Sequence, residues 1–202
     1  MNVYVESNFV LELALLQEQS ASCEELLSLG ESGRVTLVIP AYSLAEPYET
    51  LIRRRNQRRR IKHALDDELK QIARNASYAD RIDRFEELTA LLISSADEGV
   101  RHLQNVLTKV VGVAEVIPLD GPVLEASIGY QQSHDFSPQD AIVYASVVSD
   151  LRGRSPDDRK CFLNRNSKDF DDQVVVDELQ THRCKLLPRF DSGLSFVVNE
   201  IG

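Results

Sequence analysis

Short β-type runs alternate with helical patterns along most of the chain, and this alternation limits its fold more than any other feature. Residues 35–39 form a continuous apolar, β-branched run, which is typical of a strand buried on both faces. Similar runs lie at residues 3–5, 113–119, 160–163 and 184–187. Because strands joined by helices form right-handed crossovers, we predict a three-layer α/β/α fold with a central parallel sheet of about four or five strands.

Residues 53–111 depart from the alternation. They contain no proline, and apolar residues such as Ile82, Phe85 and Leu88 recur at helical spacing. We predict that this stretch forms two or three helices, as an insertion or arm of a single domain spanning residues 1–202. Pro47 is expected to kink the helix before it or to begin a new one. The residues after 187 are expected to form a C-terminal tail.

Composition narrows the class of protein. A chain of 202 residues with 43% hydrophobic content can bury one good core. The longest apolar runs are about half the ~20 residues that a membrane span requires, so we expect a cytoplasmic protein without membrane contact. Three widely spaced cysteines indicate core positions and not a disulfide or zinc framework. The sequence has neither a Gly-rich dinucleotide fingerprint nor a P-loop.

Basic residues are concentrated in one place. The net charge of −9 disfavours a nucleic-acid partner, but its distribution matters more than its sum. Six arginines fall within eight positions, and we interpret them as RNA phosphate-binding residues; the alternative is a solvated helix face balanced by the acids at 66–68. The six are Arg53, Arg54, Arg55, Arg58, Arg59 and Arg60.

Acidic and amide residues follow the predicted strands. Glu6 ends the first strand, Glu46 and Asp140 lie early in later helices, and Asn166 and Asp169 follow the run at 160–163. In a parallel sheet these segments can meet at the carboxyl edge, where function gathers. Two carboxylates ~4 Å apart repel by roughly 4 kcal/mol at a dielectric of about 20 unless a cation neutralises them. Oxygen ligands of this kind suit Mg²⁺ or Mn²⁺ and not zinc.

Four segments resemble, in order, the motifs of the PIN-domain (PilT N-terminus-like) ribonuclease family. Residues 3–12 contain Val-Glu-Ser-Asn, and residues 39–46 end in Ala-Glu. Residues 137–145 contain Pro-Gln-Asp-Ala, and residues 162–170 end in Lys-Asp-Phe. The resemblance skips the predicted arm. It implies a PIN-like fold and a Mg²⁺- or Mn²⁺-dependent nuclease that acts on RNA.

The resemblance also implies roles for individual residues. Glu6, Glu46 and Asp140 would bind metal. Ser7 would orient Glu6 or a metal-bound water, and Asn8 would brace the site.

Two positions depart from the family pattern. Glu6 stands where aspartate is usual, and Asn166 stands where the fourth acid is usual. Asp169 or Asp135 is a candidate substitute for that acid. We predict an endoribonuclease that hydrolyses RNA with metal-activated water. Because of the two departures, the alternative is a catalytically impaired RNA-binding or regulatory module. A toxin paired with an antitoxin-like protein, and a homodimer formed through the helices, are further candidates.

Overall fold

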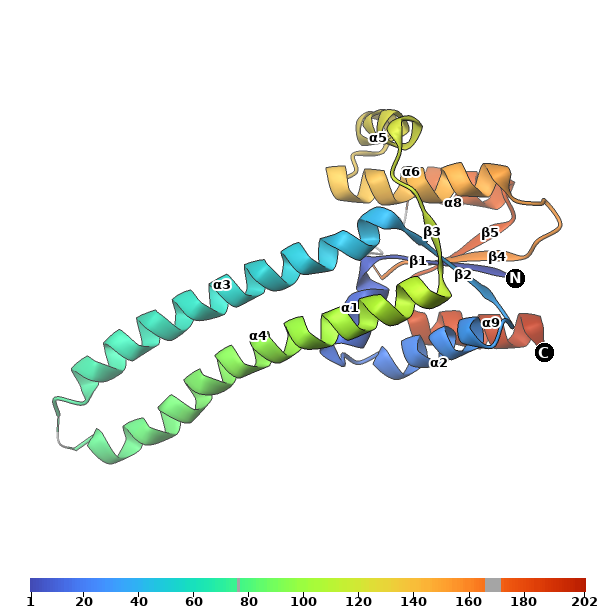
Figure 1. Cartoon of the computed structure of the whole chain (residues 1–202). Coiled ribbons are helices and arrows are strands. Elements are labelled where there is room, and N and C mark those ends of the chain that lie inside the picture. Colours follow the sequence, from blue (N-terminus) through green and yellow to red (C-terminus); the bar gives the residue numbers. More distant parts are fainter. Residues whose placement is uncertain (76, 166–171) are drawn as a thin grey trace.

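In the computed structural model, five parallel strands form one sheet in the order β3-β2-β1-β4-β5, with helices on both faces (Figure 1). The strands are β1 (Asn2–Val5), β2 (Thr36–Pro40), β3 (Glu115–Ile117), β4 (Lys160–Leu163) and β5 (Cys184–Leu187). The helices are α1 (Ser7–Leu15), α2 (Ser20–Glu31), α3 (Ala41–Ile72), α4 (Ala79–Val113), α5 (Gly121–His134), α6 (Pro138–Gly153), α8 (Gln173–Thr181) and α9 (Phe190–Ile201). The structure describes residues 1–75, 77–165 and 172–202, leaving aside the side chains of 79–84 and 86. The predicted three-layer α/β/α fold is confirmed.

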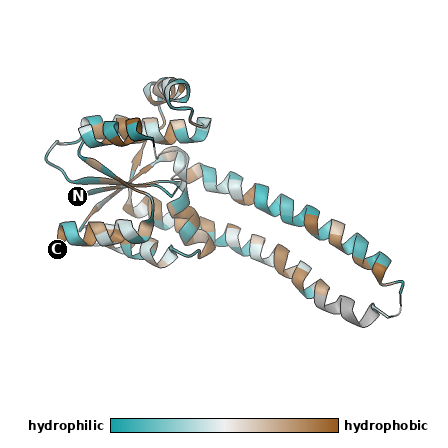
Figure 2. Ribbon diagram, turned by 180° about the vertical axis from the view of Figure 1, so that it is seen from behind, coloured by the Kyte–Doolittle hydropathy of each residue, from teal (hydrophilic) through white to brown (hydrophobic). Residues whose placement is uncertain are grey.

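Each strand is covered on both faces, which explains its continuous apolar sequence. Val3 and Val5 pack with α1, α2, α9 and the inner part of α4. Tyr4 points the other way, and its parallel partner Phe162 packs beside it against α6 and α8. The apolar residues accordingly gather in the strands and in the inward faces of the helices (Figure 2). The three cysteines are free and buried in this core, as predicted.

The strand order reverses at β1. The strands β2 and β3 lie on one side of it, and β4 and β5 lie on the other. The carboxyl ends of β1 and β2 lie at the edge from which α3 leaves the sheet (Figure 1). Ligands of open α/β sheets bind outside the carboxyl ends of the strands at such a reversal. This edge is therefore the place to look for a functional site.

The helices α3 and α4 run side by side away from the sheet as a hairpin arm (Figure 1). The inner end of α4 belongs to the core, since Leu103 and Val110 are fully buried. Among the described residues, the arm consists of these two long helices, and α3 continues through Pro47. The expectation of a new helix at Pro47 is therefore wrong. Lacking an N–H, Pro47 gives up a bond to the Ser43 carbonyl, which the rest of a 32-residue helix tolerates.

The predicted C-terminal tail is also wrong, because α9 occupies that segment. Phe190 and Val197 are fully buried in the layer that holds α1 and α2. Gly193 permits this close packing: a Cβ there would lie 2.6 Å from Leu163 Cδ2. Within the part of the chain that the structure describes, no helix has the length and apolar character needed to cross a membrane.

Candidate active site

Glu6 occupies the turn between β1 and α1. It is the N-cap of α1, and its Oε2 accepts a hydrogen bond from the Asn8 backbone N–H at 2.8 Å. The residue is only 6% exposed, and its Oε1 has no hydrogen-bond partner among the described residues. Burial raises the pKa of Glu6 to about 7, and the negative charge of Glu46 adds to the shift. Among the described residues, Glu6 forms no ion pair that would offset this burial.

Glu46 reaches the same place from the second turn of α3. Its Oε2 accepts a hydrogen bond from the Ser7 hydroxyl, so the first residue of α1 joins the two acidic segments. Burial raises the pKa of Glu46, and the charges of Asp140 and Glu49 raise it further. Ser7 thus orients Glu46, whereas the resemblance implied that it orients Glu6 or a water.

Asp140 enters from the opposite helix layer, at the start of α6. The Ser137 hydroxyl accepts from the Asp140 backbone N–H at 3.1 Å and donates to the Asp140 carboxylate. Asp140 therefore takes part in capping the helix and also contributes negative charge to the site.

These segments enclose a pocket of about 220 Å³. Its described lining consists of three carboxylates, two arginines, three further polar side chains close to the strand ends and three more residues. They are Glu6, Glu46, Asp140, Arg53, Arg54, Ser7, Asn8, Asn164, Leu11, Thr50 and Val143. Glu6, Glu46 and Asp140 thus converge although they are far apart in the sequence.

The fourth motif is described only in part. Asn166 and Asp169 lie outside the described residues, so their predicted roles stay predictions. Asp135 is the left-handed residue that ends α5, with φ 53°, and it is not in the described pocket lining. Asn164, which we did not select, follows β4 directly, is 3% exposed and lines the pocket. The strand-end rule that selected Glu6 would also have selected Asn164.

The arginine run is divided between two faces of α3. Arg53 and Arg54 line the pocket, whereas Arg55 and Arg58 turn towards α4. Arg55 Nε lies 3.1 Å from Asp97 Oδ1, in an ion pair without hydrogen-bond alignment. Arg58 Nη1 donates to Ser95 Oγ at 3.0 Å. The last two members of the run, Arg59 and Arg60, are exposed.

A family model described as PIN domain matches residues 3–170, which is most of the chain. The chain belongs to the PIN domain family. No curated protein matches it. The match confirms the predicted PIN-like fold. PIN domains are generally nucleases and typically use divalent metal ions.

The chemistry of this PIN domain pocket fits a divalent cation. Glu6 has a buried oxygen without a partner, and Glu46 and Asp140 add charge beside it. In the described structure, however, no three acidic, His or Cys side chains are gathered closely enough to form a ready metal site. The hydroxyls of Ser7 and Ser137 each engage one of the carboxylates instead. Each serine engages one oxygen of its carboxylate, so the other oxygen of Glu46 and of Asp140 could bind a cation.

The buried carboxylate makes the stability of this PIN domain depend on pH. Because the pKa of Glu6 rises from 4.5 to about 7 on folding, the folded state favours the protonated form. The stability that protonated Glu6 contributes to the folded state is fully present below the pKa of the unfolded state, 4.5, and is lost as the pH rises through about 7. In metal-free buffer, Glu6→Gln should therefore raise the free energy of unfolding by up to about 3 kcal/mol at alkaline pH and change it little at acidic pH.

Thermal unfolding of both proteins in EDTA across this pH range checks the expectation. Glu25→Gln on the exposed surface of α2 is the matched control and should follow wild type at every pH. Parallel curves for wild type and Glu6→Gln would contradict the argument.

Proposed function

We propose that this PIN domain is a metal-dependent endoribonuclease that hydrolyses RNA phosphodiester bonds. The observation that carries the proposal is the convergence of Glu6, Glu46 and Asp140 on one pocket that Arg53 and Arg54 also line. Carboxylates that follow strands or begin helices from three separate segments supply the oxygen ligands that Mg²⁺ and Mn²⁺ prefer. Arginines beside them supply contacts for a phosphate.

Six residues of the pocket have a definite part in this proposal. Glu6 and Glu46 would hold the cation from the β1 side, and Asp140 would hold it from the α6 side. The cation, Mg²⁺ or Mn²⁺, would supply activation of a water molecule and stabilisation of the charge on the leaving oxygen. The Ser7 hydroxyl limits the orientations of the Glu46 carboxylate through their hydrogen bond. Arg53 and Arg54 would bind the phosphate next to these acids.

Cleavage of single-stranded RNA tests the proposal. Wild-type protein with Mn²⁺ should cleave, EDTA should stop cleavage, and Asp140→Asn should slow it by at least about tenfold because one ligand charge is lost. Asp157→Asn is the matched control, since the Asp157 side chain is 93% exposed on the loop before β4. Equal trace cleavage by wild type and Asp140→Asn would refute the proposal.

The separation of the carboxylates favours a second candidate, a PIN domain that binds RNA without cutting it. Among the described residues, no three acidic, His or Cys side chains are gathered closely enough for a ready metal site, which would weaken metal binding. Calorimetric titration with Mn²⁺ separates the two candidates, since absence of binding at millimolar metal would favour the second. A toxin role, an antitoxin-like partner and a homodimer stay predictions from the sequence.

A further inference from the structure

A groove of about 670 Å³ lies on the arm next to the pocket. Its described lining comes from one face of α3 and consists of Glu49, Ile52, Arg53, Asn56, Gln57 and Arg60. These residues recur at spacings of one, three and four, as residues on one side of a helix do. Arg53 lines both the groove and the pocket, so the two hollows are neighbours that share this side chain.

The groove has the chemistry of a site for a nucleic-acid backbone. Arg53 and Arg60 can bind phosphates, and the amides of Asn56 and Gln57 can bind phosphate, sugar or base edges. One acid, Glu49, lies at the end near the pocket, where it adds to the negative charge around Glu46. Tyr48, 37% exposed and one turn before Ile52, offers an aromatic surface beside the groove.

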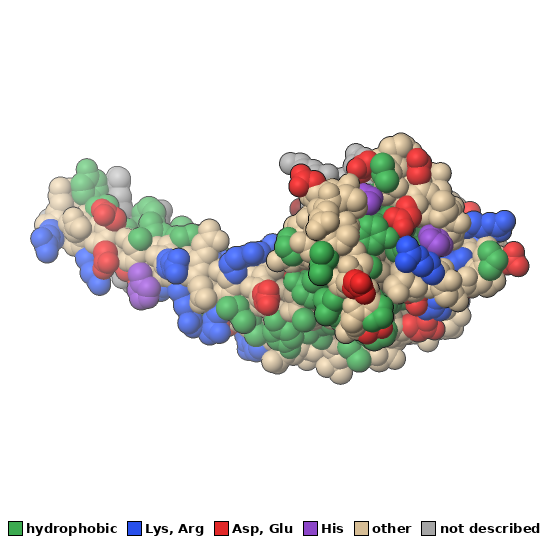
Figure 3. Space-filling view, turned by 90° about the horizontal axis from the view of Figure 1, so that it is seen from above, with side chains coloured by type: hydrophobic (Ala, Val, Ile, Leu, Met, Phe, Trp, Pro, Cys, Tyr) green, Lys and Arg blue, Asp and Glu red, His purple; other side chains and the backbone are tan. Residues whose placement is uncertain are grey.

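The other side of α3 has a different task. Arg55 and Arg58 contact Asp97 and Ser95 of α4, and Lys62 pairs with Asp66 along its own helix at 2.6 Å. Arg55 and Arg58 therefore hold the two helices of the arm together, which leaves them less able to bind phosphate. Seen from above, Lys and Arg side chains lie along the arm from its junction with the body outwards (Figure 3).

We propose that the outward face of α3 from Arg53 to Arg60 is a track for single-stranded RNA that leads into the pocket, while Arg55 and Arg58 only brace the arm. This inference rests on the proposed function for the identity of the nucleic acid. From Glu46 to Arg60 the helix rises about 21 Å at 1.5 Å per residue, so the track continues well beyond the cleavage site. A single row of donors on one helix matches one strand, whereas duplex RNA is recognised across its minor groove.

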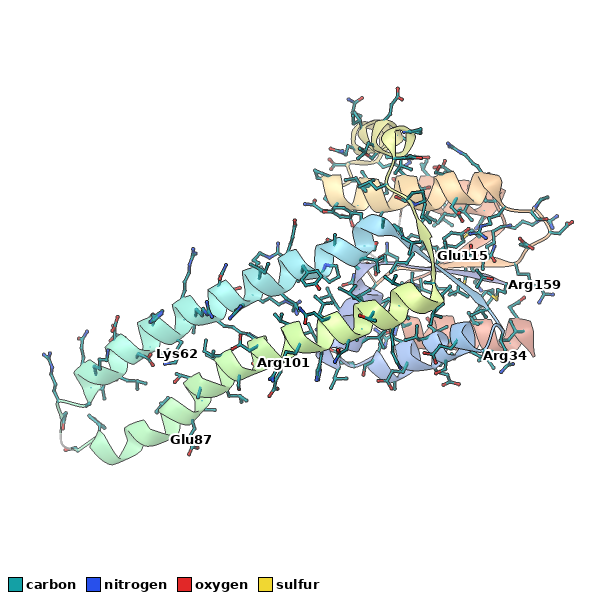
Figure 4. The ribbon with its side chains drawn as sticks, in the orientation of Figure 1. Arg34, Lys62, Glu87, Arg101, Glu115 and Arg159 are labelled. Carbon is teal, nitrogen blue, oxygen red and sulfur yellow. The ribbon has the colours of Figure 1, made fainter. Side chains whose placement is uncertain are left out.

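Binding of a fluorescein-labelled oligouridylate in EDTA tests the track without cleavage. The double variant Arg53→Ala, Arg60→Ala should bind roughly tenfold more weakly at moderate salt, and its salt slope should fall by about 1.4, because about 0.7 is lost for each single-strand phosphate contact. Arg101→Ala is the matched control: it removes one exposed positive charge from α4 of the same arm (Figure 4). It should bind almost as tightly as wild type.

Three results would overturn the track. They are an equal loss in Arg101→Ala, an unchanged affinity in the double variant, and duplex RNA of the same length that binds as tightly as the single strand. Thermal melting of each variant verifies that the arm is intact. In the cleavage assay, Arg60→Ala should raise KM and leave kcat within about twofold, because Arg60 binds substrate away from the reacting bond.

The two proposals fail in different ways. If RNA binds through Arg53 and Arg60 but is never cut, the track stands and the nuclease proposal falls. If Arg60→Ala binds and cuts RNA as wild type does, the nuclease proposal stands and the track falls.

Discussion

Replacing Glu46 by glutamine is expected to lower kcat/KM for RNA cleavage by at least about a hundredfold, which corresponds to about 2.7 kcal/mol of lost transition-state stabilisation. Glutamine keeps the size of the side chain and an oxygen that can still accept from the Ser7 hydroxyl. The variant therefore removes a ligand charge and little of the packing. Because burial and the charge of Asp140 raise the pKa of Glu46, removal of its charge should not reduce stability.

Single-turnover cleavage and Mn²⁺ titration of the same preparation separate chemistry from folding. The control is Glu125→Gln on α5, a swap at an exposed position away from the pocket, which should cleave like wild type. Wild-type cleavage and metal affinity in Glu46→Gln would exclude Glu46 from the site. A large fall in melting temperature would instead show that Glu46 is structural.

Replacing Glu12 by alanine is expected to destabilise the fold by about 2–4 kcal/mol, which lowers the melting temperature by at least about 4 °C in a domain of this size. Glu12 is fully buried in α1. Its carboxylate forms an ion pair with Arg165 and accepts from the Gln19 backbone N–H at 2.9 Å. The Gln19 side chain in turn accepts from the Phe190 N–H at 2.7 Å. Glu12→Ala would therefore leave the buried Gln19 N–H without its acceptor and take one of two carboxylate partners from the Arg165 guanidinium.

The same guanidinium offers an internal control. Arg165 also pairs with Glu18 at 3.1 Å, but the Glu18 side chain is 77% exposed. Exposed pairs contribute little, so Glu18→Ala should cost less than about 1 kcal/mol. The double variant Glu12→Ala, Arg165→Ala should be more stable than the sum of the single changes predicts. Equal losses in Glu12→Ala and Glu18→Ala would show that burial does not set the strength of this network.

The same network connects stability to the candidate site. Arg165 follows Asn164, which lines the pocket, so Glu12 anchors the segment that leaves β4. From the sequence, Glu12 reads only as a charge that interrupts an apolar helix. Its burial depends on Arg165, more than 150 positions away, and helical periodicity carries no information about a partner at that distance.

Local pattern was sufficient for the strands and for the carboxylates at their ends. Continuous β-branched runs are stable when both faces are covered, and right-handed crossovers bring their carboxyl ends to one edge. Glu6 could therefore be selected as a residue at a strand end, whereas the resemblance to the PIN-domain motifs selected Glu46 and Asp140 with it. The same reasoning missed α9, although Phe190, Leu194 and Val197 have helical spacing, because the segment was short and its docking surface is built by distant elements.

The sequence by itself determined the parallel α/β fold and the position of the helical arm, because each follows from periodicity and chain direction. Only the tertiary structure decided what the arginines face. Neighbouring side chains on a helix point about 100° apart, so the packing of α3 on α4 directs Arg55 and Arg58 inwards and leaves Arg53 and Arg60 beside the groove. Four of the six arginines are thereby divided between bracing the arm and facing the groove.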